Sequence, residues 1–316
     1  MEQQSGSRQP RPRLGVSRCL LGDRVRYDGG HRHDRFITDT LARYVDLIPV
    51  CPEAEAGLGT PREPMHLVRT GGGMRVRGNF SATDHTAALQ GLVERRVAEL
   101  ANEHLDGFVL KARSPSCGLA VSVEGSRGGA PGLFAAALTA AMPGLVVIEE
   151  RGVATPARRE AFCIRLFAHA RLRGLLEQAW TPATLAAFHT REKMLLLGQD
   201  RSLYDRLGRV VAGSGTRPRA DTEAEYAAVF SRALAKTATI GHHINVLQHL
   251  AGHFRQSLDA ARRDVLHTTI DRYRTGAVPR GQVLALVRDL AEELDLAWVR
   301  EQSYLAPCPE ELLEQP

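Results

Sequence analysis

The fold is decided by three stretches that each contain a cysteine after an apolar run: Leu14-Gly-Val-Ser-Arg-Cys19, Leu47-Ile-Pro-Val-Cys51-Pro-Glu53 and Phe108-Val-Leu-Lys-Ala-Arg-Ser114-Pro-Ser-Cys117-Gly118. Each apolar run is typical of a buried parallel strand, and Gly or Pro follows each cysteine within a few residues, which indicates a loop. The carboxyl ends of parallel strands meet at one edge of a sheet, where open α/β sheets bind their ligands. The sequence therefore predicts that the three thiols face one another there.

Composition and length indicate a soluble, cytoplasmic protein of two domains. The chain has 316 residues, which is longer than a single core usually grows, with 43% hydrophobic and 24% charged residues. No apolar run approaches the length of a membrane span, and residues 1–13 lack the apolar core of a signal peptide. In a reducing compartment five cysteines are more plausible as metal ligands or nucleophiles than as disulfides.

The first half alternates strand and helix patterns. Strands are predicted at 14–17, 47–50, 107–111 and 145–148, with helices at 34–44, 83–105 and 132–141. A hairpin is predicted at 66–69 and 74–77, a short strand at 120–123, and a loop without regular structure at 52–64. This alternation favours an α/β domain with a mainly parallel sheet in a three-layer arrangement.

From Thr155-Pro156 onward the pattern is helical. That pair suits the start of a helix reaching 178, and further helices are predicted at 182–197, 201–211, 221–238, 241–274, 280–293 and 295–302. We therefore expect an α/β domain over 13–178 and an all-α domain over 181–316.

A single cysteine after a strand is usually a small core residue, but three at comparable positions favour a shared site. No C-x-x-C occurs, which argues against a zinc ribbon or a thioredoxin-type pair. Soft thiolates select zinc, copper(I) or iron–sulfur clusters, and a cuboidal cluster with three cysteine ligands leaves one iron open to substrate.

Polar residues accompany the cysteines. Glu53 and Ser114 would enter the same cavity, where a carboxylate can move protons; otherwise they are a solvated loop acid and a turn serine. Arg24 and Arg26 beside Tyr27, in a loop with Gly turn signals, could line a pocket for an anionic or aromatic ligand. The net charge of +5 is mild for a nucleic-acid-binding protein but compatible with one.

These motifs carry a family resemblance that covers nearly the whole chain. Gly15 to Gly30, Val50 to Glu53, Gly57 to Arg62 and Lys111 to Gly118 resemble the thiouracil desulfidase family. Phe188 to Lys193, Asn245 to Gly252 and Gln302 to Pro307 resemble a helical domain of unknown function that is commonly fused to it.

The resemblance implies a 4Fe-4S cluster held by Cys19, Cys51 and Cys117, whose open iron takes the thiocarbonyl sulfur of a thiolated uracil. The family's acid and serine match Glu53 and Ser114. Water would replace the sulfur, which leaves as hydrogen sulfide without net redox change. Fusion to the helical domain is typical of members that act on 4-thiouridine in tRNA, so tRNA is the expected partner. Substrate contacts are expected from this set: Ser17, Arg24, Arg26, Tyr27, Arg62 and Ser116.

Two alternatives stay open at this point. One is desulfuration of free 2- or 4-thiouracil or of thiouridine nucleotides, and the other is a non-catalytic iron–sulfur module that binds RNA or senses redox state. Gln199 and Cys308 depart from the residues usual in the helical domain. Cys308-Pro-Glu310 repeats Cys51-Pro-Glu53, which we interpret as coincidence because it follows a helix, and Cys163 is predicted to lie in the core.

Overall fold

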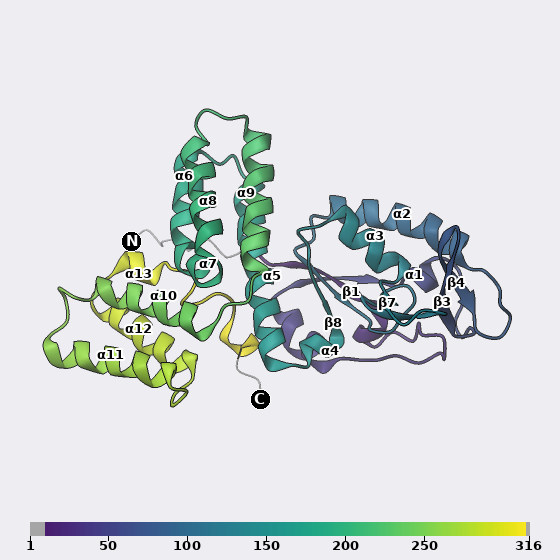
Figure 1. Ribbon diagram of the computed structural model, residues 1–316, viewed down its shortest axis with the longest axis horizontal. Coiled ribbons are helices and arrows are strands. Elements are labelled where there is room, and N and C mark those ends of the chain that lie inside the picture. The colour runs from purple at the N-terminus through teal and green to yellow at the C-terminus, as the bar shows by residue number, and fades with distance from the viewer. Residues whose placement is uncertain (1–9, 314–316) are drawn as a thin grey trace, which may run out of the picture. The chain divides into compact units, whose positions relative to one another are not determined.

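The computed structural model describes residues 10–313, and they form two compact units. Unit 1 comprises residues 10–174 together with 308–313, and unit 2 is Leu175–Pro307 (Figure 1). The C-terminal tail therefore belongs with the α/β part, whereas the sequence pattern assigned it to the helical domain. Most of the polar N-terminal segment, residues 1–9, lies outside the described residues.

The main sheet of unit 1 has four parallel strands in the order β2 (Asp46–Val50), β1 (Arg13–Ser17), β5 (Gly107–Leu110) and β8 (Val146–Glu149). The chain starts in an inner strand, continues to β2 at one edge, and then crosses to β5 and β8 on the other side. The predicted α/β class with a parallel sheet is confirmed. The change of direction at β1 places a ligand-binding crevice beyond the carboxyl ends of these strands.

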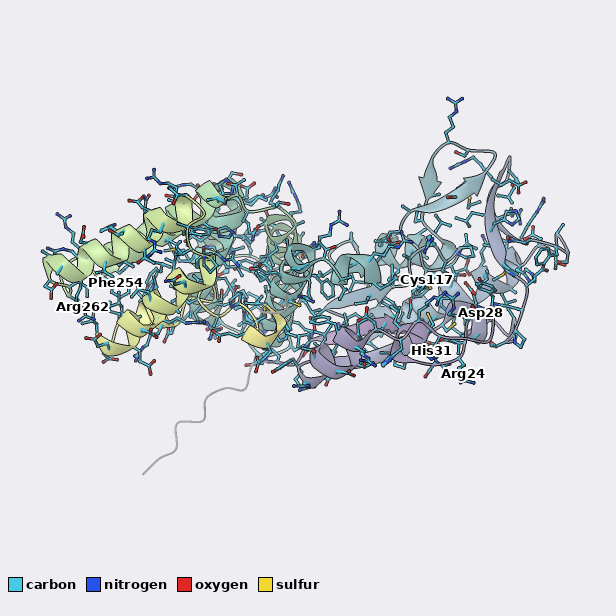
Figure 2. The ribbon with its side chains drawn as sticks, turned by 90° about the horizontal axis from the view of Figure 1, so that it is seen from below. Arg24, Asp28, His31, Cys117, Phe254 and Arg262 are labelled. Atoms are coloured by element: carbon cyan, nitrogen blue, oxygen red, sulfur yellow. The ribbon has the colours of Figure 1, made fainter. Side chains whose placement is uncertain are left out.

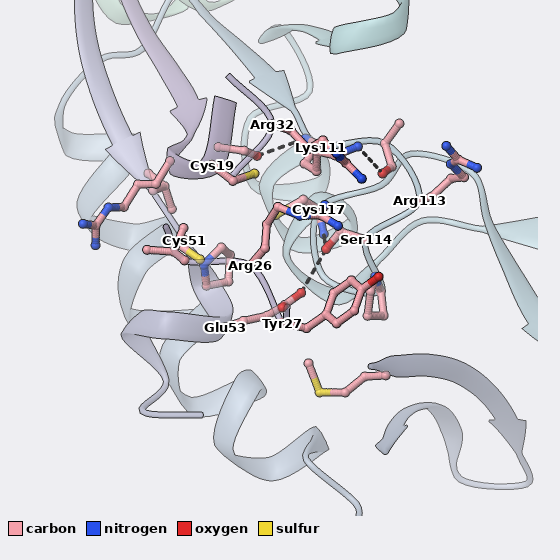
Figure 3. A pocket seen from close by; sticks show the side chains of 18 of the residues that line it. Cys19, Arg26, Tyr27, Arg32, Cys51, Glu53, Lys111, Arg113, Ser114 and Cys117 are labelled. Atoms are coloured by element: carbon pink, nitrogen blue, oxygen red, sulfur yellow. Dashed lines mark hydrogen bonds between the residues drawn. The ribbon is translucent and has the colours of Figure 1, made fainter. Parts of the chain in front are cut away.

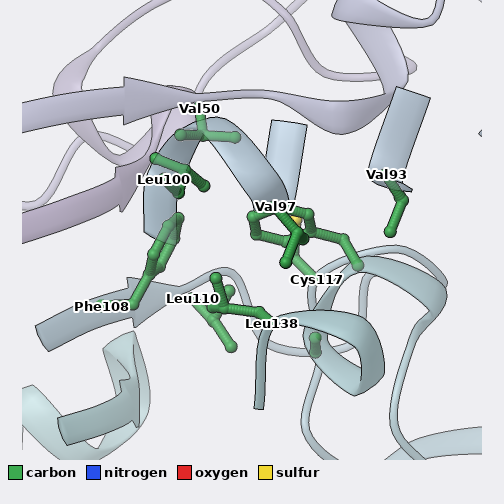
Figure 4. Packing of buried hydrophobic residues seen from close by; sticks show 10 residues of the cluster. Val50, Val93, Val97, Leu100, Phe108, Leu110, Cys117 and Leu138 are labelled. Atoms are coloured by element: carbon green, nitrogen blue, oxygen red, sulfur yellow. The ribbon is translucent and has the colours of Figure 1, made fainter. Parts of the chain in front are cut away.

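Helices cover both faces of this sheet. On one face α2 (Thr86–Asn102) and α3 (Leu133–Ala141) contribute Leu100 and Leu138 to a buried cluster with Phe108 and Leu110 of β5 (Figure 4). Successive strand residues point to opposite faces, so Gly107 faces the other side. There a Cβ on Gly107 would lie 2.8 Å from Leu166 Cδ1 of α5 (Pro156–Leu176). The predicted three layers are therefore present.

Unit 1 has a second sheet, in the order β4 (Gly73–Gly78), β3 (Met65–Thr70), β6 (Val121–Glu124) and β7 (Gly129–Ala130). β3 and β4 form the predicted antiparallel hairpin, and β6 pairs with β3 in parallel. Its own small core contains Leu67, Val76 and Val123.

Two local predictions in unit 1 were wrong. The segment predicted as a helix at 34–44 is a π-helical turn, Phe36–Thr40, followed by a 3-10 turn, Leu41–Arg43. Here the Thr38 hydroxyl contacts the Asp34 carbonyl at 3.4 Å and donates to Asp39 Oδ1 at 2.7 Å, which competes with a regular helix. The segment predicted as an irregular loop begins with α1 (Pro52–Glu55), because a proline at the first position and acids in the first turn favour a helix start. The remaining short elements of unit 1 are η1 (Arg18–Leu21), α4 (Glu150–Val153) and η4 (Glu310–Leu312).

Unit 2 is helical, as predicted. Its helices are α6 (Pro182–Arg191), α7 (Lys193–Gln199), α8 (Arg201–Gly213), α9 (Arg219–Leu234), α10 (Ile240–His253), α11 (Ala260–Arg274), α12 (Arg280–Glu293) and α13 (Ala297–Arg300). The helices predicted at 182–197 and 241–274 are each two helices. The second break is stabilised by Asp259, which caps α11 by accepting the Arg262 N–H at 2.8 Å. Within residues 10–313, none of the helices has the length and apolar character that a bilayer span requires.

Candidate functional site

A cavity of about 410 Å³ lies at the carboxyl ends of β1, β2 and β5. Cys19, Cys51 and Cys117 all line it, together with Glu53 and Ser114 (Figure 3). The other lining residues are Ser17, Arg18, Val25, Arg26, Tyr27, Arg32, Val50, Pro52, Arg62, Pro64, Met65, Lys111, Ala112, Arg113 and Pro115. The sheet edge thus brings together residues that are about a hundred positions apart in sequence.

Cys19 and Cys51 are placed by the ends of neighbouring strands. Cys19 lies in η1 directly after β1, and its carbonyl accepts the Arg32 N–H at 2.8 Å. Gly22 ends this turn at φ +100°, a left-handed conformation that favours glycine. Cys51 follows β2 and precedes α1, and its N–H donates to Glu55 Oε1 at 2.7 Å.

Cys117 is held by the packing of its loop on the start of α3. The Ser116 carbonyl accepts the N–H groups of Phe134 and Ala135 at 3.0 and 3.1 Å, so the loop satisfies backbone donors at the helix N-terminus. A Cβ on Gly132 would lie 2.5 Å from the Ser116 backbone, which only glycine avoids. The loop also folds on itself, since Ser114 Oγ accepts the Cys117 N–H at 3.2 Å.

The three thiols share one poorly solvated environment. Burial, followed by the proximity of Cys51, raises the pKa of Cys19 to about 12. Burial also raises the pKa of Cys117 well above its usual value, and the nearby Glu53 and Cys51 add to this effect. Burial is the main cause of the raised pKa of Cys51 as well. Without a metal, the raised pKa values keep these three thiols protonated. A cationic metal group can replace the protons, because metals bind cysteine as the thiolate.

The donor set consists of three thiols, the ligand type that zinc, copper(I) and iron–sulfur clusters take. Among residues 10–313, no three His, Cys, Asp or Glu side chains are close enough to hold one metal ion. A zinc ion would need each thiolate at about 2.3 Å. An iron–sulfur cluster binds its cysteine thiolates at separate iron atoms.

Glu53 and Ser114 contact each other directly. The Ser114 hydroxyl donates to Glu53 Oε1 at 3.0 Å (Figure 3), and the Arg62 guanidinium pairs with the other carboxylate oxygen. The side chains of Glu53 and Arg62 are only 13% and 8% exposed. Ser114 Oγ accepts the N–H groups of Ser116 and Cys117, so its own proton is directed at Glu53. This geometry suits proton transfer between a hydroxyl and a carboxylate.

Two acids at the end of β8 hold the loop that carries Ser114 and Cys117, and the sequence pattern did not identify their role. The Glu150 carboxylate pairs with the Lys111 ammonium and accepts the Ala112 N–H at 2.6 Å. Glu149 Oε1 accepts the Leu119 N–H at 2.8 Å. The signal was present in the sequence, because a fourth parallel strand ending in Glu149-Glu150 must reach the same edge.

The predicted substrate contacts divide into two groups. Ser17, Arg26, Tyr27 and Arg62 line the cavity, whereas Arg24 and Ser116 do not. Arg24 is exposed, and in Figure 2 it lies at the edge of unit 1 while Cys117 lies inside. Ser116 is fully buried, and its hydroxyl has no hydrogen-bond partner among the described residues. The lining residues that the sequence pattern missed include four cations: Arg18, Arg32, Lys111 and Arg113.

Comparison with known proteins agrees with this geometry. The family model described as 2-thiouracil desulfurase matches residues 14–150, which include every residue that lines the cavity. A second model, "Protein of unknown function (DUF1722)", matches residues 193–309. The uncharacterised protein YbgA of Escherichia coli (strain K12) is 31% identical over 147 residues, 46% of this chain and 87% of YbgA. The uncharacterised protein YbbK of Bacillus subtilis (strain 168) is 30% identical over 122 residues, 36% of this chain and 78% of YbbK.

The chain belongs to the 2-thiouracil desulfurase family. The resemblance seen in the sequence motifs is thereby confirmed, and membership in this desulfurase family makes the chain an enzyme of carbon–sulfur bond cleavage. Among solved structures, the [4Fe-4S]-dependent thiouracil desulfidase TudS is 30% identical, covers 45% of this chain and 93% of its own, and gives a TM-score of 0.38.

Proposed function

We propose that this desulfurase family member acts on 4-thiouridine in tRNA, replacing the thiocarbonyl sulfur with oxygen and releasing hydrogen sulfide. The observation that carries the proposal is the charge of the cavity wall. Six cationic side chains line the cavity; four of them pair with a carboxylate, and the other two, Arg32 and Arg113, have none within 4.0 Å among the described residues. A neutral thiouracil ring gains little from such a wall, whereas a thiolated nucleotide within RNA carries phosphates that bind arginine and lysine.

In this proposal Cys19, Cys51 and Cys117 hold a 4Fe-4S cluster as thiolates. The proposal is supported by three buried thiols that line one cavity, and TudS is named as a [4Fe-4S]-dependent enzyme. With three protein ligands, the bound cluster supplies a soft Lewis acid for the thiocarbonyl sulfur.

Side chains of the protein transfer the protons and position the water whose oxygen enters the ring. Water contributes its oxygen to the ring and its two protons to the departing sulfide, so the reaction needs no electron donor. Glu53 accepts a proton from the Ser114 hydroxyl, or from a water bound to that hydroxyl, and passes it toward the sulfur. Arg62 keeps the Glu53 carboxylate oriented toward Ser114.

The rim of the cavity suits an unstacked pyrimidine. Tyr27 is 40% exposed, and the Arg26 guanidinium carbon lies 5.1 Å from the centre of its ring. Chemistry on a base within folded RNA generally requires that the base leave its stack, and aromatic side chains commonly receive it. We assign the positioning of the rest of the tRNA to the helical unit.

A substrate comparison tests the proposal. Protein with an anaerobically reconstituted cluster is given thiolated tRNA, 4-thiouridine monophosphate or free 4-thiouracil, and hydrogen sulfide and the desulfurated product are measured. We expect kcat/KM to be highest for tRNA and lowest for the free base. Preference for the free base would replace the proposal with thiouracil desulfuration, and lack of turnover on all three would favour a non-catalytic RNA-binding or redox-sensing module.

A further inference from the structure

We infer that the Phe80 ring is a stacking platform for the nucleobase that neighbours the target uridine in the RNA strand. The inference rests on the proposed function and deepens it, because it gives unit 1 an RNA contact outside the cavity. The occupant is one unpaired base, which the ring contacts through its flat face.

The exposure of Phe80 is the first observation. Phe80 is 83% exposed, and the next most exposed large hydrophobic residue in the described part of the chain, Ile240, is 56% exposed. Full burial of a phenylalanine side chain contributes about 1.5–3 kcal/mol. The chain by itself does not gain this contribution, so the ring is available to a partner.

The loop that presents the ring is held in place by hydrogen bonds. It joins β4 to α2 (Figure 1). Glu63 Oε2 accepts the N–H groups of Phe80 and Ser81 at 2.8 and 3.0 Å, and Glu63 Oε1 accepts the Ser81 hydroxyl. The base of the loop is closed by the Gly78 N–H, which donates to the Thr83 carbonyl at 3.0 Å. A fixed backbone lowers the entropy that a ligand must overcome to order the ring.

Hydrogen bonds also connect this loop to the wall of the cavity. The Asn79 N–H donates to the carbonyl of Pro64, a lining residue, at 2.9 Å. Two residues earlier, the N–H of Arg62 donates to the Tyr27 carbonyl at 2.8 Å, and both of these residues line the cavity. The loops of Tyr27 and Phe80 are therefore bound to the same short segment of the wall, which places two exposed aromatic residues at that segment.

The surroundings of Phe80 fit a single planar ligand. Its neighbours Asn79, Ser81, Thr83 and Asp84 are polar and exposed, so the ring is not part of a contiguous apolar patch of the kind that binds proteins or membranes. A uridine that enters the cavity must leave its stack, and the base beside it then has an uncovered face. Aromatic side chains stack on such faces with little dependence on sequence, because every base has a π-face.

Binding of short RNA tests the platform without relying on turnover. Full-length protein with a reconstituted cluster is titrated with single-stranded oligoribonucleotides that contain one uridine, either intact or with an abasic residue on its 5′ or its 3′ side. An abasic residue keeps the phosphates and removes only the base. The wild type should bind the intact strand roughly tenfold more tightly than one of the abasic strands. Phe80→Ala should weaken binding of the intact strand by the same factor and leave binding of that abasic strand unchanged.

Two further variants separate stacking from general hydrophobic contact and from folding. Phe80→Trp keeps an aromatic face and should retain the preference for the intact strand, whereas Phe80→Leu keeps an apolar side chain without a ring and should lose most of it. All three variants should melt as the wild type does, because the side chain is exposed. Wild-type protein that does not distinguish the intact strand from either abasic strand would overturn the inference. An equal effect of Phe80→Ala on intact and abasic strands would also overturn it.

Turnover assays distinguish failure of this inference from failure of the proposed function. Phe80→Ala should lower kcat/KM for thiolated tRNA roughly tenfold and leave that for 4-thiouridine monophosphate unchanged. If the wild type does not turn over thiolated tRNA but the preference for the intact strand depends on the Phe80 ring, the proposed tRNA activity fails and the platform stands. If thiolated tRNA is turned over equally by wild type and Phe80→Ala, the proposed function stands and the platform is refuted.

Discussion

The tripeptide Cys-Pro-Glu occurs twice in unit 1, and only one copy belongs to the cavity. Cys51-Pro52-Glu53 directly follows a parallel strand, and its cysteine and glutamate line the cavity. Cys308-Pro309-Glu310 lies in the C-terminal tail, where Cys308 is 5% exposed and is not among the lining residues. Both copies lead into a short helical turn, α1 and η4. Position at the carboxyl edge of the sheet, rather than the tripeptide, makes the site.

The second copy lies in a tail that packs on unit 1. Leu312, four residues after Cys308, is completely buried, and Glu311 accepts a hydrogen bond from the Tyr44 hydroxyl. A hydrogen bond from the Glu311 backbone N–H, followed by the one from Tyr44, lowers the pKa of the Glu311 carboxyl. The tail is thereby attached to unit 1 by apolar burial and a surface contact. In the first copy the cysteine and the glutamate line the cavity, whereas in the second copy the cysteine is buried in the tail and the glutamate is exposed.

Substituting the cysteines should give the largest difference between the two Cys-Pro-Glu copies. Cys51→Ala removes a thiolate from the proposed cluster and should abolish both the bound iron and the desulfuration, as should Cys19→Ala and Cys117→Ala. Cys308→Ala and Cys163→Ala remove buried cysteines that do not line the cavity and should keep both. Iron content, visible absorbance and hydrogen sulfide release measure the outcome. Equal iron in all five variants would refute the assignment of ligands.

Substituting the glutamates of the two copies should have the second largest effect, on kcat. Glu53→Gln keeps the shape of the side chain but cannot accept the Ser114 proton, so kcat should fall by roughly 100-fold or more while iron content is retained. The matched Glu310→Gln variant should stay within about twofold of wild-type kcat, because Glu310 is exposed and does not line the cavity. Full activity of Glu53→Gln would remove Glu53 from the mechanism.

The helical unit separates the two copies in sequence, and its removal tests what it adds. A variant in which a Gly/Ser linker replaces Leu175–Pro307 keeps the tail of unit 1, whereas deletion of 181–316 also removes buried Leu312. With the linker, kcat/KM for thiolated tRNA should fall about tenfold or more through lost phosphate and shape contacts, and that for 4-thiouridine monophosphate should not change. Undiminished tRNA turnover would show that the helical unit has another role.

The smallest effect concerns the support of the third cysteine. Gly132→Ala places a Cβ against the Ser116 backbone, which should shift the Cys117 loop and cost roughly 1–3 kcal/mol of unfolding free energy. Gly91→Ala is the matched control, because a Cβ there meets nothing within 4 Å in the middle of α2, and it should stabilise by about 0.5–1 kcal/mol. Thermal melting distinguishes the two. An unchanged unfolding free energy for Gly132→Ala would mean that the Cys117 loop can shift without cost to stability.

Sequence patterns predicted much of this protein because the signals are local. The apolar runs before Cys19, Cys51 and Cys117 identified three strand ends, and parallel pairing then required that they share an edge. The helical second half was evident from periodicity. Prediction failed where a weak local signal competed with side-chain contacts, as in the π-helical turn at Phe36–Thr40, and where long apparent helices broke in two.

The sequence by itself determined which residues are available: the thiols, Glu53 and Ser114, and an abundance of arginine. Only the tertiary structure decided which cationic side chains pair with carboxylates of the protein and which line the cavity without such a partner. Arg24 and Arg32 look equivalent in sequence, yet only Arg32 lines the cavity, and Glu149 and Glu150 became loop supports only when β8 joined the sheet. The physical reason is that strand and helix preferences act over a few residues, whereas ion pairing and burial depend on segments that the fold brings together.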